Sequence, residues 1–200
     1  MRSLLVLAAA SAAALAQSAA PASQVPAFKE SGSVMAPITI ELYTDFQCPH
    51  CRAFYLDVLP QLTNDFIKTA KVRLIHRDFP LSQFQYSRTA MHFANAAGQI
   101  GKYDAVSQQL FESQPEWSQT GDVEAAVAKV LTPSELARVK TIIRTDTHLD
   151  DSVNRDVQMA TEVDHVMSTP GIVIVYRGKR ETINGAPTYA NLKAYLNSKL

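Results

Sequence analysis

The chain has 200 residues, with 19 basic and 19 acidic side chains and a formal net charge of zero. Both signs of charge are interspersed, and no stretch is strongly basic, which argues against nucleic acid or an anionic lipid surface as a partner. The length suits one compact domain, or one domain that carries an insertion.

Residues 1–16 have the pattern of a secretory signal peptide. Arg2 is the only charged side chain among them, and residues 4–15 form an almost uninterrupted run of small and apolar side chains. The sequence Ala14-Leu15-Ala16 then places small residues where signal peptidases recognise them, which predicts cleavage before Gln17. The alternative is a membrane anchor, but a span needs ~20 apolar residues and this run is shorter. We therefore expect export to the periplasm, an oxidising compartment.

Residues 17–36 are rich in alanine, serine and proline and show no hydrophobic period. This composition predicts a flexible leader that contributes little to a core. Order should begin with a strand at residues 38–44, where Ile38, Ile40 and Leu42 alternate with other side chains. The strand runs almost directly into the first cysteine of the chain.

A helix should follow that strand. Pro49 suits its first position, where the missing N–H costs nothing. Pro60 lies inside the helical pattern and predicts a kink or a break. The apolar face is spaced by four residues and consists of Phe54, Val58, Leu62 and Phe66. A second strand is expected at residues 71–77, and residues 77–81 end it.

Residues 82–167 contain a series of amphipathic helices and almost no strand pattern. One of these helices has a clear start, because Thr132-Pro133-Ser134-Glu135 is a capping box with proline at the first helical position. The chain then returns to strands at residues 171–176 and 180–183, which form a hairpin, and a last helix opens at Pro187. This order predicts one domain in two parts, residues 37–81 and 168–200, with a helical insertion at residues 82–167.

The two cysteines of the chain form the sequence Cys48-Pro49-His50-Cys51. Two thiols three positions apart at the start of a helix suit a disulfide that is made and broken repeatedly, with the first sulfur exposed and the second turned inward. A permanent structural disulfide is the alternative, but so short a loop stabilises little. We expect Cys48 to be the nucleophile, because the N–H groups and dipole of a helix N-terminus favour a thiolate there. Cys51 is then the resolving thiol.

Three segments together resemble the DsbA-like thiol:disulfide oxidoreductases of the thioredoxin superfamily. They are the strand-to-helix signature YTDFQCPHC at residues 43–51, the RDFPL motif at residues 77–81, and Thr169-Pro170 before a buried strand. A bare pair of cysteines is a weak signal, whereas this combination is specific. The resemblance covers residues 38–200 and implies an α/β class protein, a thioredoxin fold with an inserted all-helical domain.

The resemblance also implies a function and its partners. It implies that the chain transfers disulfides to reduced exported proteins and is reoxidised by a quinone-linked membrane partner, without an organic cofactor. It implies that Thr169-Pro170 is a cis-proline segment beside the cysteines, which leaves the Thr169 backbone free to pair with an extended substrate. A disulfide reductase or isomerase is the alternative, although no obvious N-terminal dimerisation domain is present, and we expect a monomer.

One position departs from the family pattern. Many relatives have a buried acid six residues before the first cysteine, and this chain has Leu42 there. Glu41 is one step away, so its side chain should lie on the opposite face of the strand. We therefore do not assign the role of the buried acid to Glu41, and proton transfer at Cys51 should rely on water or on no specific group.

Two further hypotheses concern histidines and metals. His50 lies between the two cysteines, where an imidazole can stabilise the Cys48 thiolate and so make the disulfide a stronger oxidant. A metal-binding carrier is the alternative from a different class, but a closed zinc site needs about four ligands. The other histidines have no paired spacing that would complete such a site, so we expect no metal.

Overall fold

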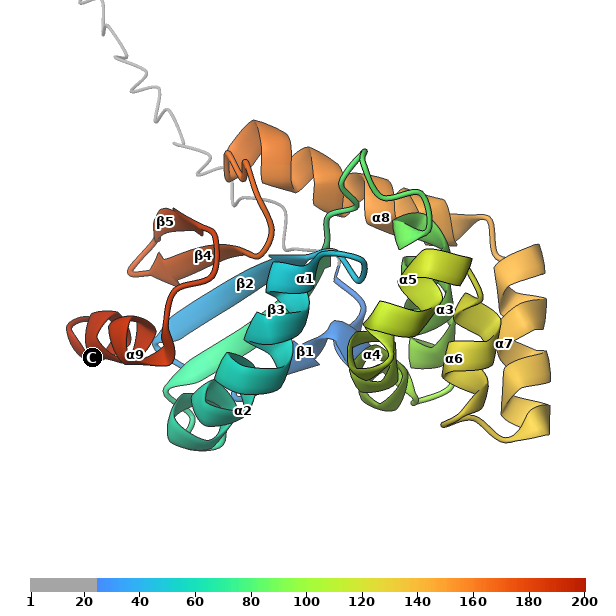
Figure 1. The fold of residues 1–200 in the computed structure, drawn as a ribbon. Coiled ribbons are helices and arrows are strands. Elements are labelled where there is room, and N and C mark those ends of the chain that lie inside the picture. Colours follow the sequence, from blue (N-terminus) through green and yellow to red (C-terminus); the bar gives the residue numbers. More distant parts are fainter. Residues whose placement is uncertain (1–24) are drawn as a thin grey trace, which may run out of the picture.

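The structure is a computed structural model that describes residues 25–200. The expected signal peptide, its cleavage site and the first part of the leader lie outside the described residues. Figure 1 shows a sheet on one side of the molecule and the helices α3 to α7 gathered on the other, with α8 running back towards the sheet. Among the described residues, no helix is long and apolar enough to cross a lipid bilayer.

The sheet has five strands in the order β1-β3-β2-β4-β5. Their bounds are Glu30–Ser31 for β1, Ile38–Thr44 for β2, Val72–Asp78 for β3, Gly171–Tyr176 for β4 and Lys179–Asn184 for β5. The central strand β2 is parallel to β3 and antiparallel to β4. The strands expected from the alternating and β-branched patterns are confirmed, including the hairpin of β4 and β5.

The connection from β2 to β3 is one nearly continuous helical segment. It consists of α1 (Pro49–Ala53), a π-helical turn (Phe54–Val58), α2 (Leu59–Leu62) and a second π-helical turn (Thr63–Ile67). Pro60 lies in the first turn of α2, just after the wider π turn. The helix thus accommodates the missing N–H of Pro60 by a local change of hydrogen-bond pattern. The expected disruption is present, but it is a π turn rather than a break.

Between β3 and β4 the chain forms helices almost throughout. They are α3 (Ser87–Gly98), α4 (Tyr103–Glu112), α5 (Gln114–Thr120), α6 (Val123–Ala128), α7 (Pro133–Thr145) and α8 (His148–Gln158), which ends in a π turn (Met159–Val163). The capping box at the start of α7 is confirmed, since the Thr132 side chain accepts from the Glu135 N–H and the Glu135 side chain accepts from the Thr132 N–H. The domain boundaries drawn from the sequence remain a prediction.

The flexible leader expected at residues 17–36 is wrong for residues 27–31. Residues 27–29 form a short 3₁₀ helix, and Glu30–Ser31 adds the edge strand β1 to β3. Lys29 is fully buried, and its ammonium lies 2.5 Å from Asp78 and 3.3 Å from Asp156. The composition of this segment gives no sign that Lys29 is buried, because its two partners lie 49 and 127 residues away in sequence.

The start of the last helix differs from the prediction, whereas the opposite orientations of Glu41 and Leu42 agree with it. The last helix, α9 (Tyr189–Asn197), begins after its N-cap Thr188 rather than at Pro187, because the Thr188 hydroxyl accepts from a main-chain N–H of the first turn. Leu42 packs in the core between the sheet, α2 and α9. Glu41 is buried on the opposite face, as alternation predicts, where it pairs with Arg77 and Arg180.

Candidate active site

The two cysteines lie where β2 passes into α1, at the boundary of the sheet and the helical insertion. Cys48 is the N-cap of α1 and Pro49 its first residue, as expected. The main-chain N–H of Arg52 donates to the Cys48 carbonyl at 3.1 Å, which closes the first helical turn. Both cysteines are free thiols in this structure, so it shows the reduced form of the pair.

The sequence predicts an exposed sulfur on Cys48, but Cys48 is buried in the structure. Cys48 is 4% exposed and Cys51 is fully buried, and both belong to the hydrophobic cluster of the helical insertion. Phe46, also in that cluster, stacks against Phe111 with ring centroids 4.9 Å apart. The insertion thus covers the cysteine pair more closely than the sequence suggests.

The two thiols have opposite acidities. A hydrogen bond from the Cys51 side chain lowers the pKa of Cys48 to about 5, although burial acts in the other direction. Thr169 and the main-chain N–H groups of Cys51 and His50 lower it further. Burial, and then the hydrogen bond to Cys48, raise the pKa of Cys51 well above its usual value. One sulfur is therefore a thiolate at neutral pH and the other a thiol that can donate to it.

The Thr169-Pro170 segment lies against the cysteines. The peptide bond between these residues is cis, as the family resemblance implies. The Cys48 sulfur lies 3.5 Å from the Thr169 carbonyl oxygen, to which it can donate only when it is protonated. The buried hydroxyl of Thr169 is near enough to lower the pKa of Cys48, although it makes no hydrogen bond of full geometry within the described residues. The fold therefore brings Cys48, Cys51 and Thr169-Pro170 together.

His50 occupies a different environment from the sulfurs beside it. Its side chain is exposed, whereas both cysteines are buried. The hydrogen bond through which His50 stabilises the Cys48 thiolate comes from its main-chain N–H. Tuning by the imidazole therefore stays a hypothesis.

Asp45 is the buried acid beside the cysteines that the sequence reading did not single out. Its carboxylate accepts hydrogen bonds from the Gln47 N–H at 2.8 Å, the Leu81 N–H at 2.7 Å and the Ser87 hydroxyl at 2.5 Å. Its own N–H donates to the Cys51 sulfur at 3.5 Å. Burial raises the pKa of Asp45 to about 6, despite these three donors. Its position at the end of a strand, next to the cysteine motif, was the available signal.

A second buried polar cluster holds the sheet against α8 and the segment before Thr169. Arg180 donates to Glu41 at 2.9 Å and to Asp164 at 2.7 and 2.8 Å. The Tyr43 hydroxyl donates to Asp164 at 2.6 Å, and burial raises the pKa of Tyr43. These partners fix the chain five residues before Thr169, so Glu41 has a positioning role rather than one in proton transfer at Cys51.

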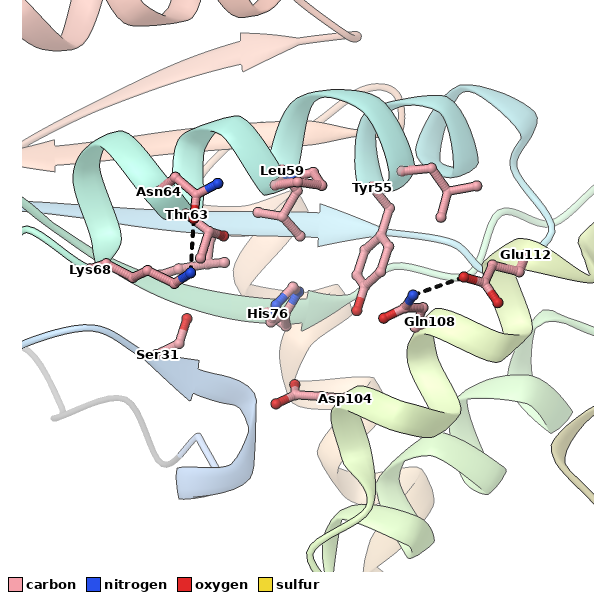
Figure 2. A pocket seen from close by; sticks show the side chains of 13 residues that line it. Ser31, Tyr55, Leu59, Thr63, Asn64, Lys68, His76, Asp104, Gln108 and Glu112 are labelled. Atoms are coloured by element: carbon pink, nitrogen blue, oxygen red, sulfur yellow. Dashed lines mark hydrogen bonds between the residues drawn. The ribbon is translucent and has the colours of Figure 1, made fainter. Parts of the chain in front are cut away.

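A pocket lies away from the thiols. It has a volume of about 660 Å³ between α2, β3 and α4, and neither cysteine lines it. Figure 2 shows Tyr55, His76 and Asp104 around this space, from three different elements. Burial and the nearby charge of Lys29 lower the pKa of His76 to about 4, so its imidazole is neutral at physiological pH.

Fold and site together define a thioredoxin-like dithiol protein: a central β-sheet, two cysteines at a strand-to-helix junction and a cis-proline segment facing them. Residues 29–198 match the family model described as Thioredoxin, and the chain belongs to that family. The family model covers both parts of the sheet and the helices inserted between them.

Relatives and solved structures agree with this assignment. The chain is 32% identical over 97 residues to the probable disulfide bond formation protein D of Bacillus anthracis, across 48% of this chain and 42% of that protein. It is 28% identical over 107 residues to disulfide bond formation protein D of Bacillus subtilis (strain 168), across 48% of this chain and 46% of that protein. The matches thus span less than half the length of these curated relatives.

Solved structures extend the similarity of fold over most of the chain. Wolbachia pipientis alpha-DsbA1 superimposes with a TM-score of 0.71 at 20% identity, over 86% of this chain and 89% of that one. Oxidised BdbD from Bacillus subtilis superimposes with a TM-score of 0.69 at 22% identity, over 86% and 91%. The expected α/β thioredoxin fold is therefore confirmed.

Proposed function

We propose that this chain is an exported thiol:disulfide oxidoreductase that introduces disulfides into client proteins through Cys48 and Cys51. The main support is the contrast between a Cys48 thiol whose pKa is lowered to about 5 and a buried Cys51 thiol whose pKa is raised. The names of the Bacillus relatives, disulfide bond formation protein D, point the same way.

The reaction follows from these acidities. A client thiolate attacks the Cys48 sulfur of the oxidised pair, the Cys48–Cys51 bond breaks, and Cys51 leaves as a thiolate that takes up a proton. A second client thiolate then attacks the client sulfur of the mixed disulfide, and Cys48 leaves. The client loses two electrons and two protons and gains a disulfide. A leaving thiol of low pKa departs quickly, so the low pKa of Cys48 favours release.

The environment of the pair supplies the recognition of clients. The cis Thr169-Pro170 segment precedes β4 and lies against Cys48. An extended client chain could pair with the Thr169 backbone there and present its thiolate to Cys48. Reoxidation by a quinone-linked membrane protein completes the cycle, with export through the signal sequence at residues 1–16, and both belong to this proposal.

A carrier that binds metal through the two thiols is less well supported. Within residues 25–200, no three or more His, Cys, Asp or Glu side chains gather in an arrangement that would hold a metal ion. The hydrogen bonds to Cys48 come instead from a second thiol and main-chain groups, which serve a thiolate nucleophile.

Cysteine substitutions test the assignment of roles. Cys48→Ser should abolish disulfide exchange, since the attacked sulfur is missing. Cys51→Ser should instead accumulate mixed disulfides with a client protein that carries a disulfide, because the Cys48 thiolate attacks that disulfide, one client sulfur leaves as a thiolate, and the Cys51 thiol that would release the client is missing. Non-reducing electrophoresis and mass spectrometry detect both outcomes. Retained exchange by Cys48→Ser, together with no trapped client on Cys51→Ser, would show that the assignment is wrong.

A further inference from the structure

The helical insertion contacts the cysteine loop through hydrogen bonds as well as apolar packing. The Gln114 side-chain amide, at the start of α5, donates from Nε2 to the Phe46 carbonyl at 2.6 Å and to the Cys48 carbonyl at 3.0 Å. The Arg52 side chain donates to the Phe111 carbonyl at 2.9 Å, in the opposite direction. These bonds connect α4 and α5 to the residues on both sides of Cys48.

Gln114 is built into this position. It is 5% exposed, and a primary amide nitrogen has two N–H groups, one for each carbonyl. Both carbonyls belong to the loop between β2 and α1, where no neighbouring strand pairs with them. A buried carbonyl without a donor is costly, and the Phe46 carbonyl has no main-chain donor among the described residues, so it needs a donor from elsewhere in the fold. Gln114 supplies it from 68 residues away in sequence.

The orientation of the Phe46 and Cys48 carbonyls determines the position of the Cys48 sulfur relative to the N–H groups that donate to it. The Cys48 carbonyl also accepts from the Arg52 N–H, which closes the first turn of α1. Fixing this carbonyl fixes the peptide plane between Cys48 and Pro49, and with it the direction of the following N–H groups. Two of those groups, in His50 and Cys51, donate to the Cys48 sulfur. The amide of Gln114 therefore acts on the sulfur through the backbone.

We propose that Gln114 is a positioning residue for the nucleophile, by which the helical insertion holds Cys48 in the geometry that stabilises its thiolate. This inference rests on the proposed role of Cys48 as the reactive sulfur. It gives the insertion a role in the chemistry, besides covering the sheet. Gln114 does not contact the sulfur itself.

The alternative is that Gln114 merely fills space, and substitutions of similar volume separate the two. Gln114→Met keeps the volume and loses both donors, whereas Gln114→Glu keeps the shape and turns acceptor oxygens towards two carbonyl oxygens. We expect the acid dissociation constant of the Cys48 thiol to fall about two- to tenfold in Gln114→Met, the equivalent of one hydrogen bond, and further in Gln114→Glu. If the role were packing alone, Gln114→Met, which adds no charge, would titrate as the wild type does.

A matched control is available on the same helix. Gln119 is exposed and donates to the Pro115 carbonyl, so Gln119→Met removes an amide donor that does not touch the cysteine loop. It should leave the titration of Cys48 unchanged. A shift in Gln119→Met as large as that in Gln114→Met would overturn the inference, because any loss of an amide from α5 would then have the same effect.

The measurement is the ultraviolet absorbance of the thiolate in the reduced full chain as a function of pH, with the melting temperature of each variant as a check on folding. Should Gln114→Met fail to fold, Gln114→Asn, whose amide is one methylene group short, carries the same prediction. An unchanged thiol titration in these variants refutes the inference even if Cys48→Ser abolishes exchange. Conversely, exchange retained by Cys48→Ser refutes the proposed function, whatever the titration shows.

Discussion

Cys48 combines burial with a lowered pKa, which is unusual because burial alone disfavours a thiolate. The neighbouring groups reverse the usual effect: the Cys51 thiol, Thr169 and two main-chain N–H groups all stabilise the anion. Asp45 works against it, because its carboxylate and the thiolate are both anionic, and the thiolate contributes to the raised pKa of Asp45. The acidity of Cys48 thus depends on the neighbouring residues of α1 and on Thr169, which is 121 residues away in sequence.

The thiolate of Cys48 should titrate with a midpoint near pH 5 in the reduced protein. His50→Leu should raise this midpoint if the imidazole stabilises the thiolate, and leave it unchanged if only the main-chain N–H acts, since the substitution keeps that N–H. Absorbance of the thiolate against pH measures both, with Cys48→Ser as the blank. A midpoint near the ordinary value for a thiol, about 8.5, would contradict the account of the site.

At this scale the sequence predicted the reactive residues but not their support. Cys48, Cys51 and Thr169-Pro170 carry a local signature that can be recognised in a single chain. Gln114 and two of the partners of Asp45, Leu81 and Ser87, cannot be found this way, because they lie 36 to 68 residues from the groups they contact. Their amides, hydroxyls and main-chain groups have no distinguishing pattern before the fold brings them together.

Helices and strands were predicted correctly where the hydrophobic periodicity of the sequence is strong. They were missed where the contacts of a single side chain determine the position of the segment. The alternation in β2, the β-branched run of β4 and the capping box of α7 all gave the observed elements. The short strand β1 has two residues and no period. Its placement depends on the preceding Lys29, which reaches Asp78 on β3 and Asp156 on α8. No pattern in the leader could reveal that pairing.

Lys29 should therefore be essential to stability. Lys29→Met removes the ammonium and leaves the buried carboxylates of Asp78 and Asp156 without it, which typically costs about 3–5 kcal/mol. Urea unfolding of the oxidised protein measures the loss. Lys179→Met, at an exposed position of β5, is the control and should change the free energy of unfolding little. Equal stability of the two variants would show that Lys29 is not an anchor of the N-terminal segment.

At the scale of the whole molecule, we expect the Cys48 thiolate to account for the difference in stability between the reduced and the oxidised protein. The folded pKa of Cys48 lies below its unfolded value, so the thiolate stabilises the reduced protein fully above the unfolded pKa, partly at neutral pH, and no longer once the pH falls through about 5. At pH 7 two pKa units separate the pH from the folded pKa, which corresponds to roughly 3 kcal/mol. The oxidised protein has no thiolate and gains none of this.

We therefore expect the reduced protein to melt at a higher temperature than the oxidised protein near neutral pH, with a difference that shrinks as the pH falls through 5. The stability contribution of Asp45 depends on pH in the opposite direction, because its raised pKa makes the folded protein less stable as the pH rises through about 6. It is present in both redox states, but the Cys48 thiolate raises its pKa only in the reduced protein. The difference between the melts therefore reports Cys48 together with this smaller, opposing change at Asp45. Scanning calorimetry with and without a reductant gives this difference. A more stable oxidised protein at neutral pH would favour a reductase.

The reduction potential of the Cys48–Cys51 pair tests the proposed direction of transfer most directly. It is obtained from the oxidised fraction of the protein at equilibrium with glutathione buffers of known ratio. A stabilised thiolate makes the disulfide a strong oxidant, so we predict a potential above about −200 mV, towards the ~−120 mV of DsbA. A potential near the ~−270 mV of thioredoxin would contradict the account and identify the chain as a reductant.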